Sequence, residues 1–279
     1  MEDVGGEVRM IKRKAIAAAK KTQTPKIVFI KGKKQFVEDL DREVRVLKQG
    51  SYFVDDTSRD FHTQHGIIKK MDLQKGGRVL SDRGKEFSVF DASFIDSYRR
   101  IKRLAQIIPL KDLGFILAKT GVGSKSVVVE AGSGSGALSI FFARHVKHVI
   151  SYDIEADHQD VAKQNAARLG IVNITFKPGS IYEKIDEKNV DLVCLDVPEP
   201  WSAVVTAKGA LKQGGFLVSY SPAITQVADF VNAVAGDPDF VHLKTVEVIE
   251  REWEIDGRKV RPTSKSIIHS GFLSFARRL

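Results

Sequence analysis

Three carboxylates lie in or just after apolar runs of the sequence. If these runs are strands of an open sheet, such positions are close to where a ligand binds. Asp196 ends the run Leu192–Leu195 in the stretch DLVCLDVPEPW, Asp153 ends HVISYD, and Glu130 lies within VVVEAGSGSGAL. Such runs are typical of buried parallel strands. Open sheets of parallel strands bind ligands beyond the carboxyl ends of their strands. We therefore expect Asp153 and Asp196 to project into one crevice.

The stretch around Glu130 predicts a strand, a tight turn and the start of a helix. Gly132, Gly134 and Gly136 let the backbone approach a ligand closely, and the first turn of the helix offers unpaired N–H groups. The spacing of these glycines also satisfies the dinucleotide fingerprint, so the turn alone does not separate NAD from S-adenosylmethionine. Glu130 would repel a pyrophosphate but can serve a cationic ammonium group, which favours S-adenosylmethionine as the cofactor.

Further candidate cofactor contacts follow the next two strands. Asp153 comes 17 residues after Gly136, and a carboxylate there can accept hydrogen bonds from both hydroxyls of a ribose. Its alternative role is a cap for the helix that follows. His158 can flank the cofactor, or it can be a surface histidine. Ser180 and Ile181 come after the third strand, where a hydroxyl and a backbone amide can meet an adenine ring.

The loop after Asp196 is stiffened by two prolines. Pro198 and Pro200 remove backbone donors and fix φ, which holds a loop rigid where a flat substrate has to be gripped. Trp201 is available for packing or stacking. A role of Asp196 as a helix cap is disfavoured, because the prolines move the start of the next helix to about Ser202.

The composition is that of a globular, intracellular protein. Of the 279 residues, 43% are hydrophobic and 28% are charged, which excludes a disordered or fibrous chain. The single cysteine, Cys194, lies in an apolar run, so an intrachain disulfide and a cysteine-rich metal site are excluded. No run approaches the roughly 18 apolar residues of a membrane span, and no histidine–carboxylate cluster has metal-ligand spacing. We expect a cytoplasmic protein without a metal.

Most of the net charge of +9 lies near the N-terminus. Residues 1–34 contain ten Lys or Arg against three acidic residues. A basic segment of this kind can contact the phosphates of a polyanion, and it can equally be a solvated tail that aids solubility. We expect residues 1–24 to form a basic N-terminal extension whose role is left open.

Two further segments follow this extension. In residues 25–90, short β-like runs alternate with glycines, which predicts a small all-β domain, either a barrel or a sandwich. Residues 91–108 have helical periodicity and lead into a second domain at 91–279. Arg99 and Arg103 lie on the polar face of that helix, where they meet either solvent or a nucleic acid.

From residue 126 onward, predicted strands and helices alternate, which is typical of a mostly parallel sheet covered on both faces. The last two strand-like runs, 241–255 and 269–279, are joined without a helix, so we expect the sheet to end in an antiparallel pair. This ending is typical of methyltransferases and unusual in dinucleotide-binding folds. The predicted fold class is therefore α/β, with a Rossmann-like sheet and antiparallel final strands, preceded by the small β-domain.

Together these motifs resemble the tRNA (adenine-N1)-methyltransferases of the T loop, in their archaeal form. The resemblance covers nearly the whole chain from about residue 40. Its marks are RDFHTQHGII (59–68), GKEFSVF (84–90), IDSYRRIKRLAQII followed by Lys111-Asp112, VEAGSGSGAL (129–138), SYD (151–153), LDVPEPW (195–201), LKQGGFLVSYSP (211–222) and RPTSKSIIHSGFLSFARR (261–278).

This resemblance implies a class I methyltransferase fold and methyl transfer from S-adenosylmethionine to N1 of an adenine in tRNA. The target is usually position 58, and in archaeal members also position 57. The resemblance further implies a homotetramer whose N-terminal β-domain helps to hold the tRNA. In such a site, residues 133–136 hold the methionine end, Asp153 takes the ribose, Ser180 lies by the cofactor adenine, and Asp196 faces the target base.

Asp196 is the expected catalytic residue. A carboxylate that accepts a hydrogen bond from the N6 amine orients the adenine and favours the positive charge that develops on the ring. The expected cofactor contacts are Glu130, Gly132, Ser133, Gly134, Ser135, Gly136, Asp153, His158, Ser180, Ile181 and Asp196. The expected substrate contacts are Pro198, Trp201, Arg99 and Arg103.

The sequence departs from the family pattern at three places. Pro109-Leu110 precedes Lys111 where the family usually has an aromatic residue or histidine followed by proline, so a ring expected near the target base is missing. Asp153 stands where glutamate is usual, and Ser180 stands where aspartate is common. Both changes shorten or weaken contacts to the cofactor.

Three other functions share some of these sequence features. A protein isoaspartyl O-methyltransferase shares the glycine turn, but it gives no reason for the basic β-domain or the Pro-Glu-Pro-Trp loop. A noncatalytic tRNA-binding subunit would be expected to lose the glycine turn and Asp196, which are both intact here. An NAD-dependent oxidoreductase is distinguished by which cofactor raises the melting temperature.

Overall fold

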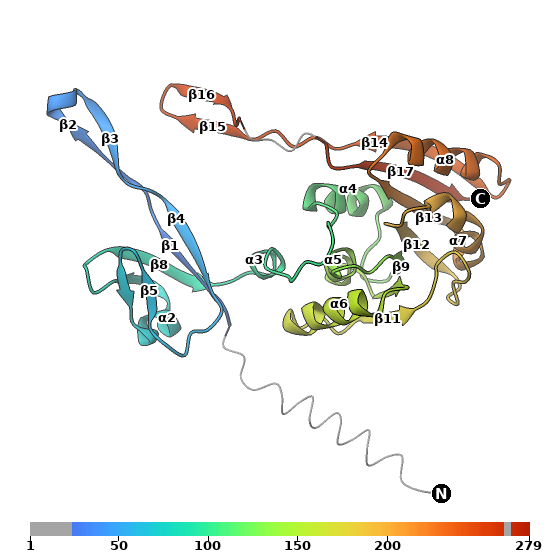
Figure 1. Cartoon of the computed structure of the whole chain (residues 1–279), viewed down its shortest axis with the longest axis horizontal. Helices are drawn as coiled ribbons and strands as arrows, with labels where there is room; N and C mark the ends of the chain where they lie inside the picture. The colour runs from blue at the N-terminus through green and yellow to red at the C-terminus, as the bar shows by residue number, and fades with distance from the viewer. Residues whose placement is uncertain (1–23, 265–268) are drawn as a thin grey trace, which may run out of the picture. The chain divides into compact units, whose positions relative to one another are not determined.

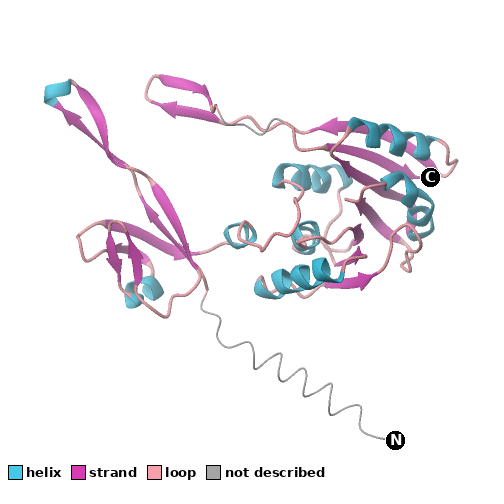
Figure 2. Ribbon diagram, in the orientation of Figure 1, coloured by secondary structure: helices cyan, strands magenta, loops and turns pink. Residues whose placement is uncertain are grey.

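The computed structural model of the protein describes residues 24–264 and 269–279 (Figures 1 and 2). The chain divides into two compact units, of which the first ends at Arg99 and the second begins at Arg100. The predicted basic extension at residues 1–24 lies outside the described residues except for its last position. Within the described ranges, no helix has the length and apolarity that crossing a membrane requires.

The first unit is built on an antiparallel sheet with the strand order β4-β1-β8-β7. Its strands are β1 (Lys26–Ile30), β4 (Gly50–Val54), β7 (Gly77–Leu80) and β8 (Glu86–Asp91). Val28, Ile30 and Phe87 are buried in a small core together with Leu73 of the helix α2 (Lys70–Lys75). The prediction of a barrel or sandwich was wrong in detail, because the sheet is open: β4 and β7 each pair on one side only among the described strands.

Two separate hairpins complete the first unit. One joins β5 (Phe61–Thr63) to β6 (Gly66–Ile68). The other joins β2 (Lys33–Val37) to β3 (Arg42–Leu47) through the 3-10 helix η1 (Glu38–Leu40). In the described part of the chain, β2 and β3 pair only with each other. This second hairpin therefore presents most of its side chains to solvent.

Residues 91–108 do not form the single helix that their periodicity predicts. The helix α3 (Phe94–Tyr98) ends after five residues, and helical structure resumes only at α4 (Leu110–Thr120). The reason is tertiary: the backbone N–H and C=O of Lys102 are bound by the side-chain amide of Asn165, both at 2.9 Å. The N–H of Leu104 donates to Ser135 Oγ at 2.9 Å. These contacts take the backbone groups that a helix would need.

The second unit contains a seven-stranded sheet with the order β11-β10-β9-β12-β13-β17-β14. Its strands are β9 (Val127–Ala131), β10 (His148–Asp153), β11 (Ile174–Pro178), β12 (Val190–Leu195), β13 (Leu211–Ser221), β14 (Phe240–Glu247) and β17 (Phe272–Arg278). The first five strands of the order pair in parallel, and β17 pairs antiparallel with both β13 and β14. The predicted α/β sheet with antiparallel final strands is therefore confirmed (Figure 2).

Helices follow the parallel strands and bring the strand ends to one edge. They are α5 (Ala137–Ala143) after β9, α6 (Ala156–Arg168) after β10, η2 (Pro200–Ala203) and α7 (Val204–Ala210) after β12, and α8 (Ile224–Ala235) after β13. Val129, Val193 and Leu195 are fully buried in a core that includes Phe230 of α8. Because the strands are parallel, the residues that follow β9, β10, β11 and β12 meet at the same edge.

The predicted continuous strand at 241–255 was wrong. The strand β14 ends at Glu247, and β15 (Trp253–Asp256) forms a hairpin with β16 (Lys259–Pro262) that pairs only with itself among the described strands. At the break, the carbonyl of Val248 accepts a hydrogen bond from the side chain of Lys111 at 2.6 Å. The Val248 carbonyl is thus satisfied by a side chain outside the sheet.

Candidate functional site

A cavity of about 320 Å³ opens at the carboxyl edge of the parallel strands. It is lined by Ala105, Gln106, Ala131, Gly132, Gly134, Tyr152, Asp153, Ile154, Glu155, His158, Gly179, Ser180, Ile181, Tyr182, Asp196, Val197 and Pro198. The lining combines residues that follow β9, β10, β11 and β12, as the sequence predicts. Three carboxylates, those of Asp153, Glu155 and Asp196, lie in the lining, so the cavity favours a ligand that carries positive charge or hydroxyl donors.

The glycine turn after β9 has two positions, Gly134 and Gly136, whose backbone conformation favours glycine. Gly134 has a φ of +49° and Gly136 has a φ of +77°, both in the left-handed region. A Cβ added to Gly136 would lie 3.0 Å from the Cβ of Ala162. The turn therefore packs directly against α6 and presents Gly132 and Gly134 to the cavity.

The two serines of the turn point away from the cavity lining. Ser133 Oγ lies 2.5 Å from the hydroxyl of Ser151, and Ser135 Oγ accepts the N–H of Leu104. Both serines are buried. Their side chains hold the turn against β10 and against the segment after α3, so any contact that they make to a ligand would come from their backbone.

Asp153 joins the glycine turn to the end of β10. Its Oδ2 accepts from the N–H of Gly134 and its Oδ1 accepts from the N–H of Glu155, both at 2.9 Å. Nδ1 of His158 lies 3.4 Å from Oδ2 of Asp153. Each carboxylate oxygen keeps a further lone pair for a ligand hydroxyl. The carboxylate is thus held in one orientation at the cavity wall.

If Asp153 takes the ribose hydroxyls, as the sequence predicts, replacing it with alanine is expected to weaken S-adenosylmethionine binding about 100-fold, because two hydrogen bonds from the ribose to a charged group would be lost. Isothermal titration of the cofactor measures this change. Asp160→Ala serves as the control, since Asp160 is an exposed carboxylate of α6 outside the cavity. An unchanged affinity in Asp153→Ala would show that this carboxylate acts only as a brace for the turn.

Asp196 follows β12 and lies in the cavity wall beside the glycine turn. Its backbone N–H donates to the carbonyl of Ala131 at 2.5 Å, and its carbonyl accepts from the N–H of Gly132 at 3.1 Å. Burial raises the pKa of the Asp196 carboxyl to about 7. A carboxyl with this pKa is partly protonated and partly ionised at neutral pH, and its ionised form can accept a hydrogen bond from an amine.

The loop after Asp196 is braced from two sides. Gln226 of α8 donates its amide N–H to the carbonyl of Pro198 at 2.9 Å, and the N–H of Glu199 donates to the hydroxyl of Tyr182 at 3.1 Å. Pro198 lines the cavity. Trp201 lies in η2, partly buried and outside the cavity lining.

Three other predicted positions lie away from the lining. Glu130 is completely buried within β9 between β10 and β12. Arg99 and Arg103 are exposed, and they belong to different units. The structure thus brings together Gly132, Gly134, Asp153, His158, Ser180, Ile181, Asp196 and Pro198, while Glu130, Ser133, Ser135, Gly136, Trp201, Arg99 and Arg103 do not line the cavity.

Glu130 is held in an unusual way for a carboxylate. The hydroxyl of Ser151 donates to Oε1, while Oε2 has no hydrogen-bond partner among the described residues. Burial, with an added contribution from the nearby carboxylate of Asp196, raises the pKa of Glu130 to about 8. The side chain is therefore mostly uncharged at neutral pH. It is linked to the glycine turn through Ser151, whose hydroxyl also contacts Ser133 Oγ.

Gln106, Glu155 and Tyr182 also line the cavity, although they were not predicted as site residues. Glu155 follows Asp153 by two positions in the stretch SYDIE, so its acidic character was a usable signal. Gln106 carried no such signal, because the segment that contains it was predicted to be helical. Tyr182 was visible as an aromatic residue after Ser180, but its bond to Glu199 depends on a loop from another strand.

No group of three or more His, Cys, Asp or Glu side chains that can hold a metal ion occurs among the described residues.

Comparison with known sequences identifies close relatives. The family described as "tRNA methyltransferase complex GCD14 subunit" matches residues 100–270. A tRNA (adenine(57)-N(1)/adenine(58)-N(1))-methyltransferase from Methanocaldococcus jannaschii is 35% identical over 256 residues, which cover 81% of this chain and 90% of that enzyme. A tRNA (adenine(58)-N(1))-methyltransferase from Thermus thermophilus is 34% identical, with 78% and 88% covered.

Comparison with solved structures gives the same fold. An S-adenosylmethionine-dependent O-methyltransferase from Thermotoga maritima has a TM-score of 0.78 at 26% identity, covering 95% of this chain and 96% of that one. The tRNA (m1A58) methyltransferase of Aquifex aeolicus has a TM-score of 0.74 at 19% identity, covering 92% and 97%. At that identity the second likeness concerns the fold alone.

Proposed function

Because the chain belongs to the TrmI family of tRNA (adenine-N1)-methyltransferases, we propose that it methylates N1 of adenine 58 in tRNA, and of adenine 57, with S-adenosylmethionine as the methyl donor. The observation that carries this proposal is the 35% identity to the archaeal enzyme across 81% of the chain. The glycine turn and Asp196, on which catalysis would depend, are both present at one cavity. We place the reaction in the cytoplasm.

The cavity residues fit S-adenosylmethionine. A Cβ added to Gly132 would lie 3.4 Å from Oδ2 of Asp153, so without a side chain at this position both the Gly132 backbone and the carboxylate line the cavity. We assign the ribose hydroxyls to Asp153 and the adenine to Ser180 and Ile181. Gly132 and Gly134 would offer their backbone to the methionine end, and His158 would flank the ribose. When bound, the cofactor supplies an electrophilic methyl group on a positively charged sulfur.

Asp196 is the residue that we assign to the target base. N1 of adenine is occupied by pairing or tertiary contacts in folded tRNA, so the base has to be extruded before it can react. N1 then carries a free lone pair and needs no deprotonation. The Asp196 carboxylate would accept a hydrogen bond from N6, orient the ring and stabilise the cation that forms. Pro198 and the braced loop around it would form the wall against which the ring rests.

The β2–β3 hairpin supplies a basic surface for tRNA. A groove on the hairpin is lined by Gly32, Lys33, Lys34, Arg45, Leu47, Lys48 and Gln49. The hairpin also exposes Phe36 and Val46, at 54% and 51%. Basic side chains with an aromatic ring among them are typical of surfaces that contact the backbone and bases of RNA. We propose that this hairpin adds to the affinity of the first unit for tRNA.

Changing Lys33, Lys34 and Lys48 together to glutamine is expected to reduce the salt dependence of tRNA binding. The slope of log K against log salt is negative, and each lost phosphate contact reduces its magnitude by about 0.7 to 0.9. Filter binding from about 50 to 300 mM salt measures that slope. The same number of charges removed at Lys125, Lys147 and Lys163 of the second unit is the control. Equal slopes in both triple variants would show that the hairpin does not contact the tRNA.

We also propose that the protein assembles as a homotetramer, as the resemblance of its sequence to the family implies. Analytical ultracentrifugation gives the mass of the particle directly. A monomer at micromolar concentration would contradict this part of the proposal.

The function is tested with radiolabelled S-adenosylmethionine and an unmodified tRNA transcript, followed by nuclease digestion and identification of the labelled nucleoside. We expect 1-methyladenosine at positions 57 and 58. Transcripts with adenine replaced at either position separate the two sites. Label in a ribose or in protein would instead support O-methyl transfer, as in the Thermotoga maritima enzyme. Cofactor binding without transfer would support a noncatalytic subunit.

A further inference from the structure

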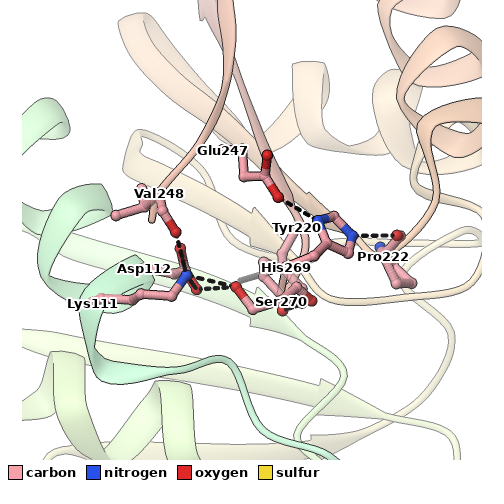
Figure 3. Close-up of polar contacts among 8 residues, drawn as sticks. All are labelled: Lys111, Asp112, Tyr220, Pro222, Glu247, Val248, His269 and Ser270. Atoms are coloured by element: carbon pink, nitrogen blue, oxygen red, sulfur yellow. Dashed lines mark hydrogen bonds and ion pairs between the residues drawn. The ribbon is translucent and has the colours of Figure 1, made fainter. Parts of the chain in front are cut away.

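A second polar cluster lies beyond the cavity lining, at the start of α4 (Figure 3). The ammonium of Lys111 donates to Asp112 Oδ2 at 2.8 Å, to Ser270 Oγ at 2.6 Å and to the carbonyl of Val248 at 2.6 Å. Ser270 Oγ donates in turn to Asp112 Oδ2 at 2.9 Å. Asp112 is completely buried, and the Lys111 side chain is only 12% exposed. The cluster therefore joins three segments of the second unit in a nearly closed environment.

The acceptors of Lys111 lie at both ends of a long excursion of the chain. Val248 directly follows β14, and Ser270 precedes β17, while the β15–β16 hairpin lies between them. His269 adds a second contact at the same base: its Nδ1 lies 2.5 Å from Glu247 Oε1, and its Nε2 lies 3.1 Å from the carbonyl of Pro222 (Figure 3). The ends of the excursion are thus held together by side chains, with Lys111 at the buried centre.

The cluster connects to the substrate side of the site through Tyr220. The hydroxyl of Tyr220 donates to the carbonyl of Ser270 at 2.5 Å. Tyr220 follows Ser219, whose register partner on β12 is Leu195, the residue before Asp196. The nearby carboxylates of Asp112 and Asp196 both act on the pKa of Tyr220, which burial chiefly raises to about 12. Tyr220 therefore joins the cluster to β13 at the position after the register partner of Leu195, which precedes Asp196.

The fit around Tyr220 leaves little freedom to the Ser270 backbone. A Cβ added to Gly271 would lie 2.5 Å from the ring of Tyr220. A small shift of residues 270 and 271 would therefore press on the ring or withdraw the carbonyl from its hydroxyl. Since Lys111 binds the Ser270 side chain, its ammonium fixes this backbone relative to α4.

We propose that Lys111 is a positioning residue for the target adenine, because it holds the Ser270 backbone against Tyr220 and so fixes the wall beside Asp196. This inference rests on the proposed function, in which Asp196 faces the base. Lys111 does not line the cavity assigned to the cofactor. Replacing it should therefore lower kcat for tRNA methylation and leave the affinity for the cofactor unchanged. The buried pair with Asp112 gives it the rigidity that positioning requires.

The first test is Lys111→Met with saturating cofactor. We expect kcat for tRNA to fall ten- to a hundredfold, while the dissociation constant for S-adenosylmethionine stays within about twofold of the wild-type value. Lys119→Met is the matched control, since Lys119 is an exposed lysine of the same helix, and it is expected to keep wild-type turnover. A wild-type kcat in folded Lys111→Met, or a loss of cofactor affinity as large as the loss of kcat, would overturn the inference.

Lys111→Met leaves the Asp112 charge buried and unpaired, which is itself destabilising. The double variant Lys111→Met/Asp112→Leu removes both charges and is expected to recover much of the melting temperature but none of the turnover, because no side chain of α4 then binds the Ser270 hydroxyl. Parallel recovery of turnover and melting temperature would reduce Lys111 to a structural role.

Tyr220→Phe keeps the ion pair and removes only the bond to Ser270, so it is also expected to lower kcat. A wild-type kcat in Tyr220→Phe would overturn the link to the site. An inactive wild-type protein would contradict the proposed function instead.

Discussion

Asp196→Ala is expected to lower kcat for tRNA methylation by about two to three orders of magnitude, while S-adenosylmethionine binding falls by less than tenfold. The side chain would be the group that orients the target base and stabilises the cation formed at the ring, and loss of one such group typically has this effect. The groups that we assign to the cofactor, Asp153 and the glycine turn, would remain in place, because their mutual hydrogen bond does not involve the Asp196 side chain. Single-turnover kinetics and cofactor titration at pH 7 measure the two effects separately.

Two further variants sharpen this test. Glu199→Ala removes an exposed carboxylate from the same loop and is expected to keep near-wild-type turnover. Asp196→Asn keeps the size of the side chain and an acceptor oxygen, but it loses the charge, so its turnover should lie between those of Asp196→Ala and the wild type. If cofactor affinity and kcat fall by the same factor in Asp196→Ala, the residue is chiefly a cofactor ligand.

The sheet and the cavity edge were accessible from the sequence because their signals are local. The apolar run from Leu192 to Leu195 predicts a strand buried on both faces, and all four side chains are fully buried. The residue that follows a parallel strand must lie at the carboxyl edge, so Asp153 and Asp196 reach the same cavity by topology alone. The antiparallel ending followed from the missing helix between the last two strand-like runs.

Features that depend on long-range contacts were not accessible in this way. The periodicity of residues 91–108 is helical, but Asn165, 63 positions along the chain from Lys102, binds the Lys102 backbone and competes with the helix. The strand predicted at 241–255 ends early beside Lys111, 137 positions from Val248. In both places a distant polar side chain takes backbone groups that a local pattern assigns to secondary structure.

Side-chain direction near the glycine turn was also beyond the sequence. Ser133 and Ser135 have the type and spacing of ligand contacts, but their hydroxyls bind Ser151 and the Leu104 backbone. Glu130 is one strand position before Ala131, which lines the cavity. Successive side chains of a strand alternate between faces, and the pattern of residue types did not fix which of the two would reach the cavity.

The buried carboxyl of Glu130 makes stability depend on pH in a predictable direction. Its pKa is raised from 4.5 to about 8, chiefly by burial, so between these values the folded protein keeps a proton that the unfolded chain has lost. The free energy of unfolding then falls as pH rises from about 5 to 8, by up to about 1.4 kcal/mol per pH unit for this one group. Asp196, whose pKa is raised to about 7, acts in the same direction.

Glu130→Gln isolates this effect, because the amide cannot ionise. We expect the variant to be close to the wild type in stability at pH 5 and increasingly more stable than it toward pH 8, as measured by chemical denaturation at each pH. Glu187→Gln is the control. Burial raises the pKa of Glu187, but hydrogen bonds from Lys177 and Tyr152 outweigh this and lower it, so Glu187 is ionised in both states above pH 5. Its variant should therefore be destabilised by a nearly constant amount. A constant difference for Glu130→Gln as well would show that Glu130 ionises normally, and would return it to the role of a charged partner for the cofactor.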